Sequence, residues 1–202
     1  GVDYIDWLGP GLMAAMAMQT ATFESTYPIM NKIMWGRNYE AMLATPLDTR
    51  SILLGELSWM GFRMATLAAV FMIVLWLFGI VASPIAVLAV PVAVLLGLGF
   101  ATWLIGYTAT QKNDLGFTWI FRFVINPLFL FSGTFFPLTQ LPQPLVVAAW
   151  ATPLFHGVEL IRGLTLGRLD PVAATLHLLY LVAFFAVGIW WADRNLARRL
   201  AV

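Results

Sequence analysis

Three side chains that can exchange protons or hold charge follow one another at intervals of three residues: His156, Glu159 and Arg162. On a helix, residues three apart share a face, so all three could line the outer end of a polar conduit. The alternative is a local pair of Glu159 with Arg162 at the water interface, which would contribute little. A zinc-binding helix needs two histidines one turn apart, so no metal site is predicted. His156 and Glu159 could also act as acid and base, although no nucleophile accompanies them.

Polar residues also interrupt two apolar stretches. Gln19 and Thr20 crowd the end of the first stretch, so that turn is expected to face protein or water rather than lipid. Asn126 precedes Pro127 inside the fourth stretch, where a proline removes a backbone hydrogen bond and kinks a helix. The kink is either a hinge or a static feature, since proline is frequent in membrane helices. Gln19, Thr20 and Asn126 are candidates for a substrate path or gate.

Phenylalanines gather after this kink, at Phe129, Phe131, Phe135 and Phe136. They are typical of packing at a membrane interface or of an aromatic box for a lipophilic ligand, and Phe135 and Phe136 join the candidates for the path or gate. His177 is expected to pack inside a helix bundle, because no acidic residue stands beside it in the sequence to support a proton relay.

Composition identifies the solvent of this chain. Apolar residues make up 61% of its 202 residues and charged residues 10%, whereas a soluble domain holds roughly 25% charged residues. Such a chain cannot cover itself with polar surface, so it is predicted to lie in a lipid bilayer. A net charge of +1 without a basic stripe argues against a nucleic-acid partner. No cysteine is present for a disulfide or a thiolate metal site.

The phosphate-cradling loop Gly-x-x-x-x-Gly-Lys-Ser/Thr does not occur in the sequence. We therefore expect no catalytic residues, no metal and no cofactor in this chain. Any ATP and Mg would be bound by a separate subunit, and the chain is not expected to be an enzyme by itself.

Five apolar stretches are long enough to cross about 30 Å of hydrocarbon as helices. They cover residues 4–23, 61–81, 85–108, 117–136 and 171–192. The sequence starts at Gly1 without a cleavage pattern, so a sixth span is expected upstream. The predicted fold class is an all-α membrane protein, a polytopic helical bundle forming one domain over residues 1–202, with five spans visible of six.

Lysine and arginine set the expected orientation, because positive charges in short loops stay on the cytoplasmic side. Only Arg162 and Arg168 fall on one side. The other side receives Lys32, Arg37, Arg50, Arg63, Lys112, Arg122, Arg194, Arg198 and Arg199. The chain is therefore predicted to be a multi-pass protein of the bacterial cytoplasmic membrane, with its C-terminus in the cytoplasm.

Two connections are too long to be simple turns. In the cytoplasmic one, residues 27–60, Pro46 ends a short helix near 37–44 and Asp48 can cap the next helix. The short helix is amphipathic, which suits a membrane surface or a partner groove. The outer connection, residues 138–170, is too broken by prolines to span, so two short helices dipping into the outer leaflet are expected.

Several strings resemble the permease subunit of bacterial type 2 ABC exporters, close to the nodulation-factor and daunorubicin export branch. The most specific are Arg37-x-Tyr-Glu-x-Met-Leu-Ala-Thr-Pro-Leu47 and Pro153-Leu-Phe-His-Gly-Val-Glu-Leu-Ile-Arg-Gly163. Residues 10–13, 19–24, 54–56 and 131–137 add weaker matches, so the resemblance covers essentially the whole chain.

The resemblance implies six spans, a cytoplasmic coupling helix and outer re-entrant helices. It implies two copies of an ABC ATP-binding subunit holding ATP and Mg, and a second permease, with a homodimer expected, in membrane lipid. The re-entrant helices would lie within 142–163 and close the exit. The coupling helix would contact the ATPase through Arg37, Tyr39, Glu40, Leu43, Pro46 and Leu47.

The expected function is ATP-driven export of a lipophilic or amphipathic substrate, such as a drug, glycolipid or saccharide. Alternating access would open a conduit between two permease copies, with the first and fourth visible spans as walls. An ion-coupled secondary transporter is an alternative, although few ionisable groups lie near the midplane. A small membrane-embedded enzyme is a further alternative. A neighbouring gene for a protein with a phosphate-binding loop would discriminate among them.

Overall fold

The computed structural model describes residues 4–137 and 142–200, apart from the side chain of Leu145. Within these ranges all regular structure is helical, which confirms the predicted all-α class. The elements are α1 Tyr4–Ser25, α2 Tyr27–Met30, the π-helix η1 Asn31–Trp35, α3 Asn38–Leu43, α4 Thr49–Leu77, the 3-10 helix η2 Pro84–Leu88, α5 Ala89–Thr110, α6 Leu115–Ile120, the π-helix η3 Phe121–Ile125, α7 Asn126–Phe131, α8 Gln143–Trp150, α9 Pro153–Leu166 and α10 Pro171–Leu200.

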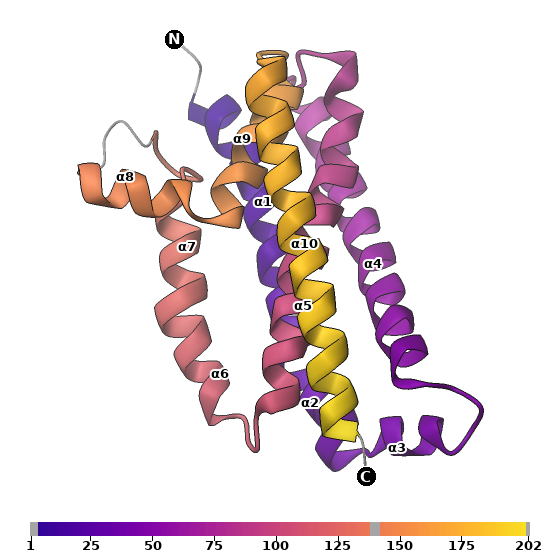
Figure 1. The fold of residues 1–202 in the computed structure, drawn as a ribbon. Coiled ribbons are helices and arrows are strands. Elements are labelled where there is room, and N and C mark those ends of the chain that lie inside the picture. Colours follow the sequence, from indigo (N-terminus) through magenta and orange to yellow (C-terminus); the bar gives the residue numbers. More distant parts are fainter. Residues whose placement is uncertain (1–3, 138–141, 201–202) are drawn as a thin grey trace.

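The long helices run side by side as one bundle (Figure 1). α5 packs against α1, α4, α9 and α10 and so lies at its centre. α2, α3 and the end of α10 lie at one end of the bundle, which we call the α3 end. The start of α1, the turn before η2 and the end of α9 lie at the opposite end, called the α9 end. The two long connections are therefore at opposite ends of the bundle.

Three helices in the described part of the chain are long and apolar enough to cross a membrane: Thr49–Leu77, Pro84–Thr110 and Pro171–Leu200. They correspond to the second, third and fifth predicted spans, and all three extend beyond the predicted bounds at the α3 end. α1 and the shorter helix Leu115–Phe131 do not meet the same measure. Much of α1 is enclosed by its neighbours, and an enclosed helix does not need a uniformly apolar surface. For these two helices, membrane crossing stays a prediction.

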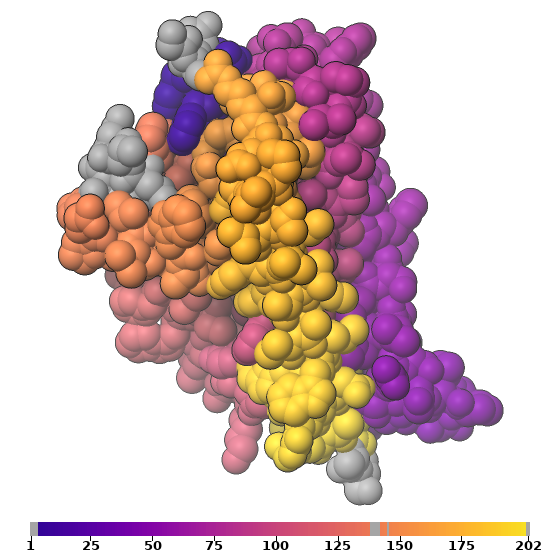
Figure 2. Space-filling view, turned by 45° about the horizontal axis from the view of Figure 1, so that its top comes forward, coloured from indigo at the N-terminus to yellow at the C-terminus, as the bar shows by residue number. Residues whose placement is uncertain are grey.

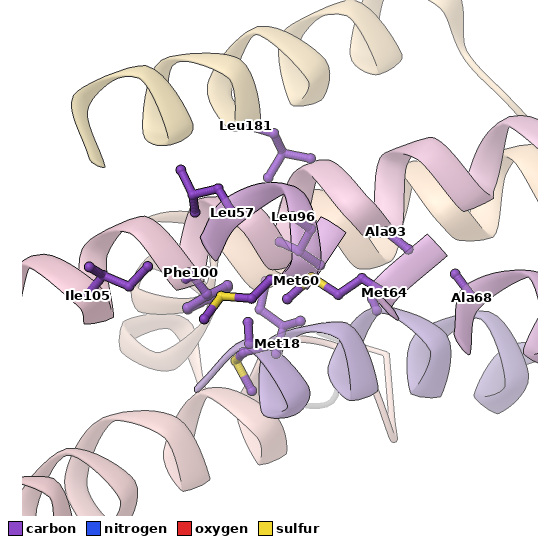
Figure 3. Close-up of a cluster of buried hydrophobic side chains, with 14 of the residues drawn as sticks. Met18, Leu57, Met60, Met64, Ala68, Ala93, Leu96, Phe100, Ile105 and Leu181 are labelled. Carbon is purple, nitrogen blue, oxygen red and sulfur yellow. The ribbon is translucent and has the colours of Figure 1, made fainter. Parts of the chain in front are cut away.

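The core lies where α1, α4 and α5 meet (Figure 3). Met18 of α1, Met60 and Met64 of α4, and Leu96 of α5 are almost fully buried there. Methionine is unbranched and polarizable, so it fills irregular gaps between helices. Lipid tails are as apolar as leucine, so close packing rather than the hydrophobic effect holds such helices together.

Small residues allow α5 to approach its neighbours closely. A Cβ on Gly97 would stand 2.5 Å from the Met64 sulfur of α4, and one on Gly106 would stand 2.6 Å from the Trp191 ring of α10. Both glycines therefore serve packing within this chain.

The fourth predicted span is interrupted as expected at Asn126 and Pro127. The turn directly before them is the π-helix η3, in which the N–H of Asn126 donates to the carbonyl of Phe121. The wider turn accommodates the missing N–H of Pro127, and such π-turns are a recognised cause of helix bending.

The same span ends earlier than predicted. Its helix stops at Phe131, because Ser132 leaves helical geometry and Gly133 adopts a positive φ of 78°. Phe135 and Phe136 therefore lie in an irregular segment beyond the helix rather than inside a span.

Candidate functional site

The segment of residues 37–47 protrudes from the body of the protein at the α3 end (Figure 2). Arg37 precedes α3 and adopts a left-handed backbone conformation with a φ of 48°. Among the described residues other than glycine, it alone has a positive φ. Glu40 lies 3.8 Å from Arg37, and both are exposed, as are Pro46 and Leu47. Leu43 is half-buried. Five of the six predicted coupling residues are therefore accessible at one end of the bundle.

Tyr39 anchors this segment. Its side chain is 1% exposed, and burial, reinforced by the nearby Glu56 carboxylate, raises the pKa of its hydroxyl. Glu56 belongs to α4, and both of its carboxylate oxygens accept from Lys32 Nζ of η1 at 2.7 Å. In this chain the enclosed ring of Tyr39 holds the segment in place, and its predicted contact with a partner stays a prediction.

Two further contacts fix the position of α4. Asp48 caps it, because the carboxylate accepts the backbone N–H of Ser51 at 2.8 Å, and hydrogen bonding from Ser51 lowers the pKa of Asp48. The predicted cap is thus confirmed. At the middle of α4, Arg63 pairs with Glu24 of α1 at 2.7 Å. Ion pairs therefore tie α4 to η1 near its start and to α1 at its middle.

At the opposite end of the bundle, Arg162 of α9 is enclosed at 5% exposure. Its Nη1 donates to Glu159 at 2.7 Å, and its Nη2 donates to the carbonyls of Gly133 at 2.8 Å and Trp7 at 3.3 Å. The guanidinium also lies 3.6 Å from the centre of the Trp7 ring. The predicted pair with Glu159 is formed, but Arg162 is buried and joins α9 to α1 and to the turn after α7.

Glycines make this close approach possible. A Cβ on Gly11 would stand 2.8 Å from the carbonyl oxygen of Thr134 and 3.2 Å from Nη2 of Arg162. Gly133 adopts a backbone conformation that residues with a Cβ rarely take. α1, α9 and the intervening turn therefore meet more closely than larger residues would permit.

The start of α9 is joined to α10 by two histidines. His156 Nδ1 lies 2.7 Å from His177 Nδ1, and His156 Nε2 lies 3.0 Å from the carbonyl oxygen of Trp150. Tyr180 stacks on His156 with ring centres 3.9 Å apart and donates its hydroxyl to the carbonyl of Ala151 at 2.7 Å. We call this contact among α8, α9 and α10 the histidine junction.

The remaining candidates for a path or gate are not gathered in one place. Gln19 is exposed on α1, whereas Thr20 lines a pocket of about 170 Å³ between α1 and α4. Asn126 is exposed where η3 ends, and Phe135 and Phe136 are half-buried in the segment after α7. Of the predicted set, the structure brings together Glu159 with Arg162, and it places His156 on the same helix α9.

Sequence reasoning missed the partners that complete this end of the bundle. His177 contacts His156 across 21 positions, and Trp7 contacts Arg162 across 155 positions. Neither contact leaves a local pattern in the sequence. The described residues include no group of three or more His, Cys, Asp or Glu side chains that could hold a metal ion.

Comparison with known proteins identifies the family. The profile described as ABC-2 type transporter matches residues 1–166. Nodulation protein J of Rhizobium leguminosarum bv. trifolii is 34% identical over 200 residues, covering 99% of this chain and 76% of the relative. Nodulation protein J of Bradyrhizobium diazoefficiens is 31% identical over 202 residues, covering 98% and 77%. No solved structure matches the chain significantly.

The family match covers both the protruding segment 37–47 and all of α9, and the relatives extend the similarity through α10. The similar proteins come from bacteria. The chain thus belongs to the ABC-2 type transporter family: it is a bacterial membrane permease, a transport subunit of the kind that works with an ATP-binding subunit.

Proposed function

We propose that the chain is the permease of an ATP-driven exporter, with its α3 end and C-terminus in the cytoplasm and its α9 end outside. The distribution of Lys and Arg between the two ends supports this orientation. In this arrangement ATP and Mg are held by the ATP-binding subunit, and this chain transmits the motion to the membrane.

The proposal rests mainly on segment 37–47, which is exposed at the α3 end and attached to the helix bundle through Tyr39. A surface that receives force from a separate motor has to be exposed to that motor and firmly tied to membrane helices. Arg37, Glu40, Leu43, Pro46 and Leu47 supply the exposed or half-exposed surface.

The tie to the membrane helices is made underneath that surface. Tyr39 is buried against the bundle, and Lys32 joins η1 to Glu56 of α4 with both carboxylate oxygens engaged. Movement of the segment is therefore passed directly to α4, and through the pair of Arg63 with Glu24 to α1. Two ATP-binding subunits that close on ATP would draw two such segments together and tilt the helices.

We propose that the helix Leu115–Phe131 lines a conduit between two identical copies of the chain. At the α3 end it meets the bundle through Phe117, whose ring contacts Tyr27 and Tyr107. At its other end it contacts α8. Its Trp119 and Phe123 rings are exposed, at 66% and 57%. This helix and α1 are the walls that we propose for a path between two copies.

The apolar pocket beside Thr20 supports the proposal that the substrate is lipophilic or amphipathic, such as a drug, a glycolipid or a saccharide. Its lining includes Met13, Met16, Met64 and Phe71, whose side chains adapt to varied apolar shapes. Thr20 adds one hydroxyl to this surface.

Charge placed on the protruding segment tests the docking surface. Leu47→Asp is expected to abolish co-purification with the ATP-binding subunit, because a carboxylate replaces an exposed apolar contact. Leu115→Asp is the matched control: Leu115 is more exposed, 70% against 48% for Leu47, and lies at the same end on α6. Equal co-purification of both variants would contradict the proposal.

A second experiment tests coupling itself. Deletion of residues 37–47 is expected to abolish stimulation of ATP hydrolysis by the permease while membrane insertion continues. The chain has no cysteine, so Glu40→Cys can be labelled selectively. A membrane-impermeant thiol reagent should label this cysteine in inside-out vesicles only. Labelling in intact cells would contradict the proposed orientation and support the opposite one.

A further inference from the structure

We propose that the histidine junction is a proton-operated latch, which holds α8 and α9 against α10 until both His156 and His177 are doubly protonated and positively charged. The inference relies on the orientation proposed above in one respect only, namely that the protons arrive from outside the cell. Its physical basis is the set of hydrogen bonds that the junction makes.

The partner atoms assign the proton positions. The carbonyl of Trp150 can only accept, so His156 Nε2, 3.0 Å away, carries a proton. A neutral His156 then has a lone pair on Nδ1, which faces His177 Nδ1 at 2.7 Å. His177 Nδ1–H is therefore the donor of the bond between the two rings.

The first additional proton leaves this bond intact. His177 can accept it on Nε2, which does not take part in the contact, and its Nδ1–H continues to donate to His156. The positive charge makes the donor stronger. A junction with one extra proton is thus at least as well held as a neutral one.

The second proton breaks it. His156 has only Nδ1 left to protonate, and two Nδ1–H groups would then point at each other across 2.7 Å. Two positive rings at this distance also repel each other. The hydrogen bond is replaced by repulsion, so the rings have to separate.

The charged groups of α9 near the junction are paired with each other, because Glu159 accepts from Arg162 at 2.7 Å. Tyr180 of α10 donates to Ala151 and stacks on His156. α8 contributes a carbonyl at Trp150, and α5 carries no Asp, Glu, Lys or Arg in its described span. Arg168 and Asp170 lie in the turn before α10.

The two sides of α9 would then respond differently to acid. On the side of α1, Arg162 is bound to carbonyl oxygens and to Glu159, and its guanidinium stays charged at every physiological pH. On the side of α10, the contact is made by two imidazoles. Acid therefore releases α8 and the start of α9 from α10, while the attachment of α9 to α1 persists.

Imidazole NMR tests the proton positions directly. The chain contains two histidines, so ¹⁵N-histidine labelling of the full chain in nanodiscs gives signals from these two rings alone. Around pH 7.5, well above the ordinary imidazole pKa of about 6.5, we expect one Nε2–H and one Nδ1–H ring, with scalar coupling between the two Nδ1 atoms. Two rings of the same tautomer, or no coupling, would overturn the assignment.

Distance measurements test the release. Val147→Cys on α8 and Leu179→Cys on α10 place spin labels at exposed positions, 68% and 60%. Between about pH 7.5 and about pH 4, a range that extends well below the ordinary imidazole pKa of about 6.5 because repulsion opposes the second proton, we expect a second, longer distance to become the main population. An unchanged distribution across this range would overturn the proposal.

Variants separate protonation from structure. His156→Gln keeps one acceptor and one donor but takes up no proton, so it should hold the short distance at both pH values. His177→Gln should do the same, because its amide can rotate to accept from a protonated His156. Tyr180→Phe removes a neighbouring bond but leaves both imidazoles, so the response to acid should persist. A pH response that survives in either glutamine variant contradicts the latch.

These measurements need neither the ATP-binding subunit nor a substrate. A failure of the coupling experiments would therefore leave the latch standing. Conversely, an unresponsive junction would leave the proposed export function in place.

Discussion

The two ends of the bundle hold their charges in different ways. Toward the α3 end, the cation is the accessible partner in the two ion pairs that join different elements: Arg63 is 50% exposed and Lys32 is 33% exposed. At the α9 end the cation is the enclosed partner: Arg162 is 6% exposed, Glu159 is 36% exposed, and Arg162 also donates to two carbonyl oxygens. An enclosed charge is expensive to leave unpaired, whereas an exposed pair such as Arg37 with Glu40 contributes little. The carbonyl contacts of Arg162 therefore fix how α1 and α9 meet.

The largest expected effect is at Arg162. Arg162→Met should lower the free energy of unfolding by about 3 kcal/mol, because buried carbonyls lose their charged donor. Arg162→Lys should recover part of the loss, since an ammonium cannot reproduce the planar fork. Steric trapping or thermal unfolding in nanodiscs would measure both. The comparison between the two ends fails if Arg37→Met, at the exposed pair with Glu40, costs as much.

Gly11 comes second. Gly11→Ala should cost about 1–3 kcal/mol, because the new Cβ meets backbone rather than a movable side chain. Gly55→Ala is the matched control, since nothing lies within 4 Å of a Cβ at that position of α4, and it should be neutral or raise stability by up to about 1 kcal/mol. Thermal unfolding of the two variants side by side gives the answer. Equal effects would show that α1 and α9 are not closely locked.

The pair of Lys32 with Glu56 should affect stability less but function more. Glu56→Gln is expected to cost about 0.5–1 kcal/mol and to reduce the substrate moved per ATP hydrolysed, because η1 loses its tie to α4. The exchanged pair Lys32→Glu with Glu56→Lys should restore part of that ratio. Transport and ATP hydrolysis measured together in proteoliposomes test this. If hydrolysis stays fully coupled in Glu56→Gln, the pair has no role in transmission.

The smallest effect is expected at the cap of α4. Asp48→Ala should loosen the first turn, seen as faster hydrogen exchange at the Ser51 amide, which loses its acceptor. The pKa of Asp48 is lowered in the folded chain. Its contribution is therefore present above the unfolded value of about 4 and is lost as the pH falls through the lower folded pKa. Exchange that is insensitive to acid in this range would contradict the cap.

Sequence reasoning succeeded where the cause of a structure is local. The cap at Asp48, the break before it at Pro46, the interruption at Pro127 and the two helices of the outer connection each follow from neighbouring residues. The long apolar helices follow from composition over about 20 residues.

It succeeded less where distant residues meet. Glu159 and Arg162 were recognisable as a pair, but the burial of Arg162 depends on Trp7 and Gly133, which no spacing rule connects to it. The amphipathic pattern of α3 placed Tyr39 on an apolar side, but its nearly complete burial depends on how the chain returns after Asp48. The contact of His156 with His177 likewise exists only because α9 and α10 pack side by side.

The length of α4 has a mechanical consequence. It contains 29 residues, so at a rise of 1.5 Å per residue it is about 43 Å long, against about 30 Å of hydrocarbon. About 13 Å of the rod must project beyond the acyl chains unless it leans strongly. A tilt of only about 10° about its middle would sweep the Asp48 end sideways by about 4 Å. Residues 37–47 directly precede this end of α4, so a small tilt about a point within the membrane displaces them by a similar distance.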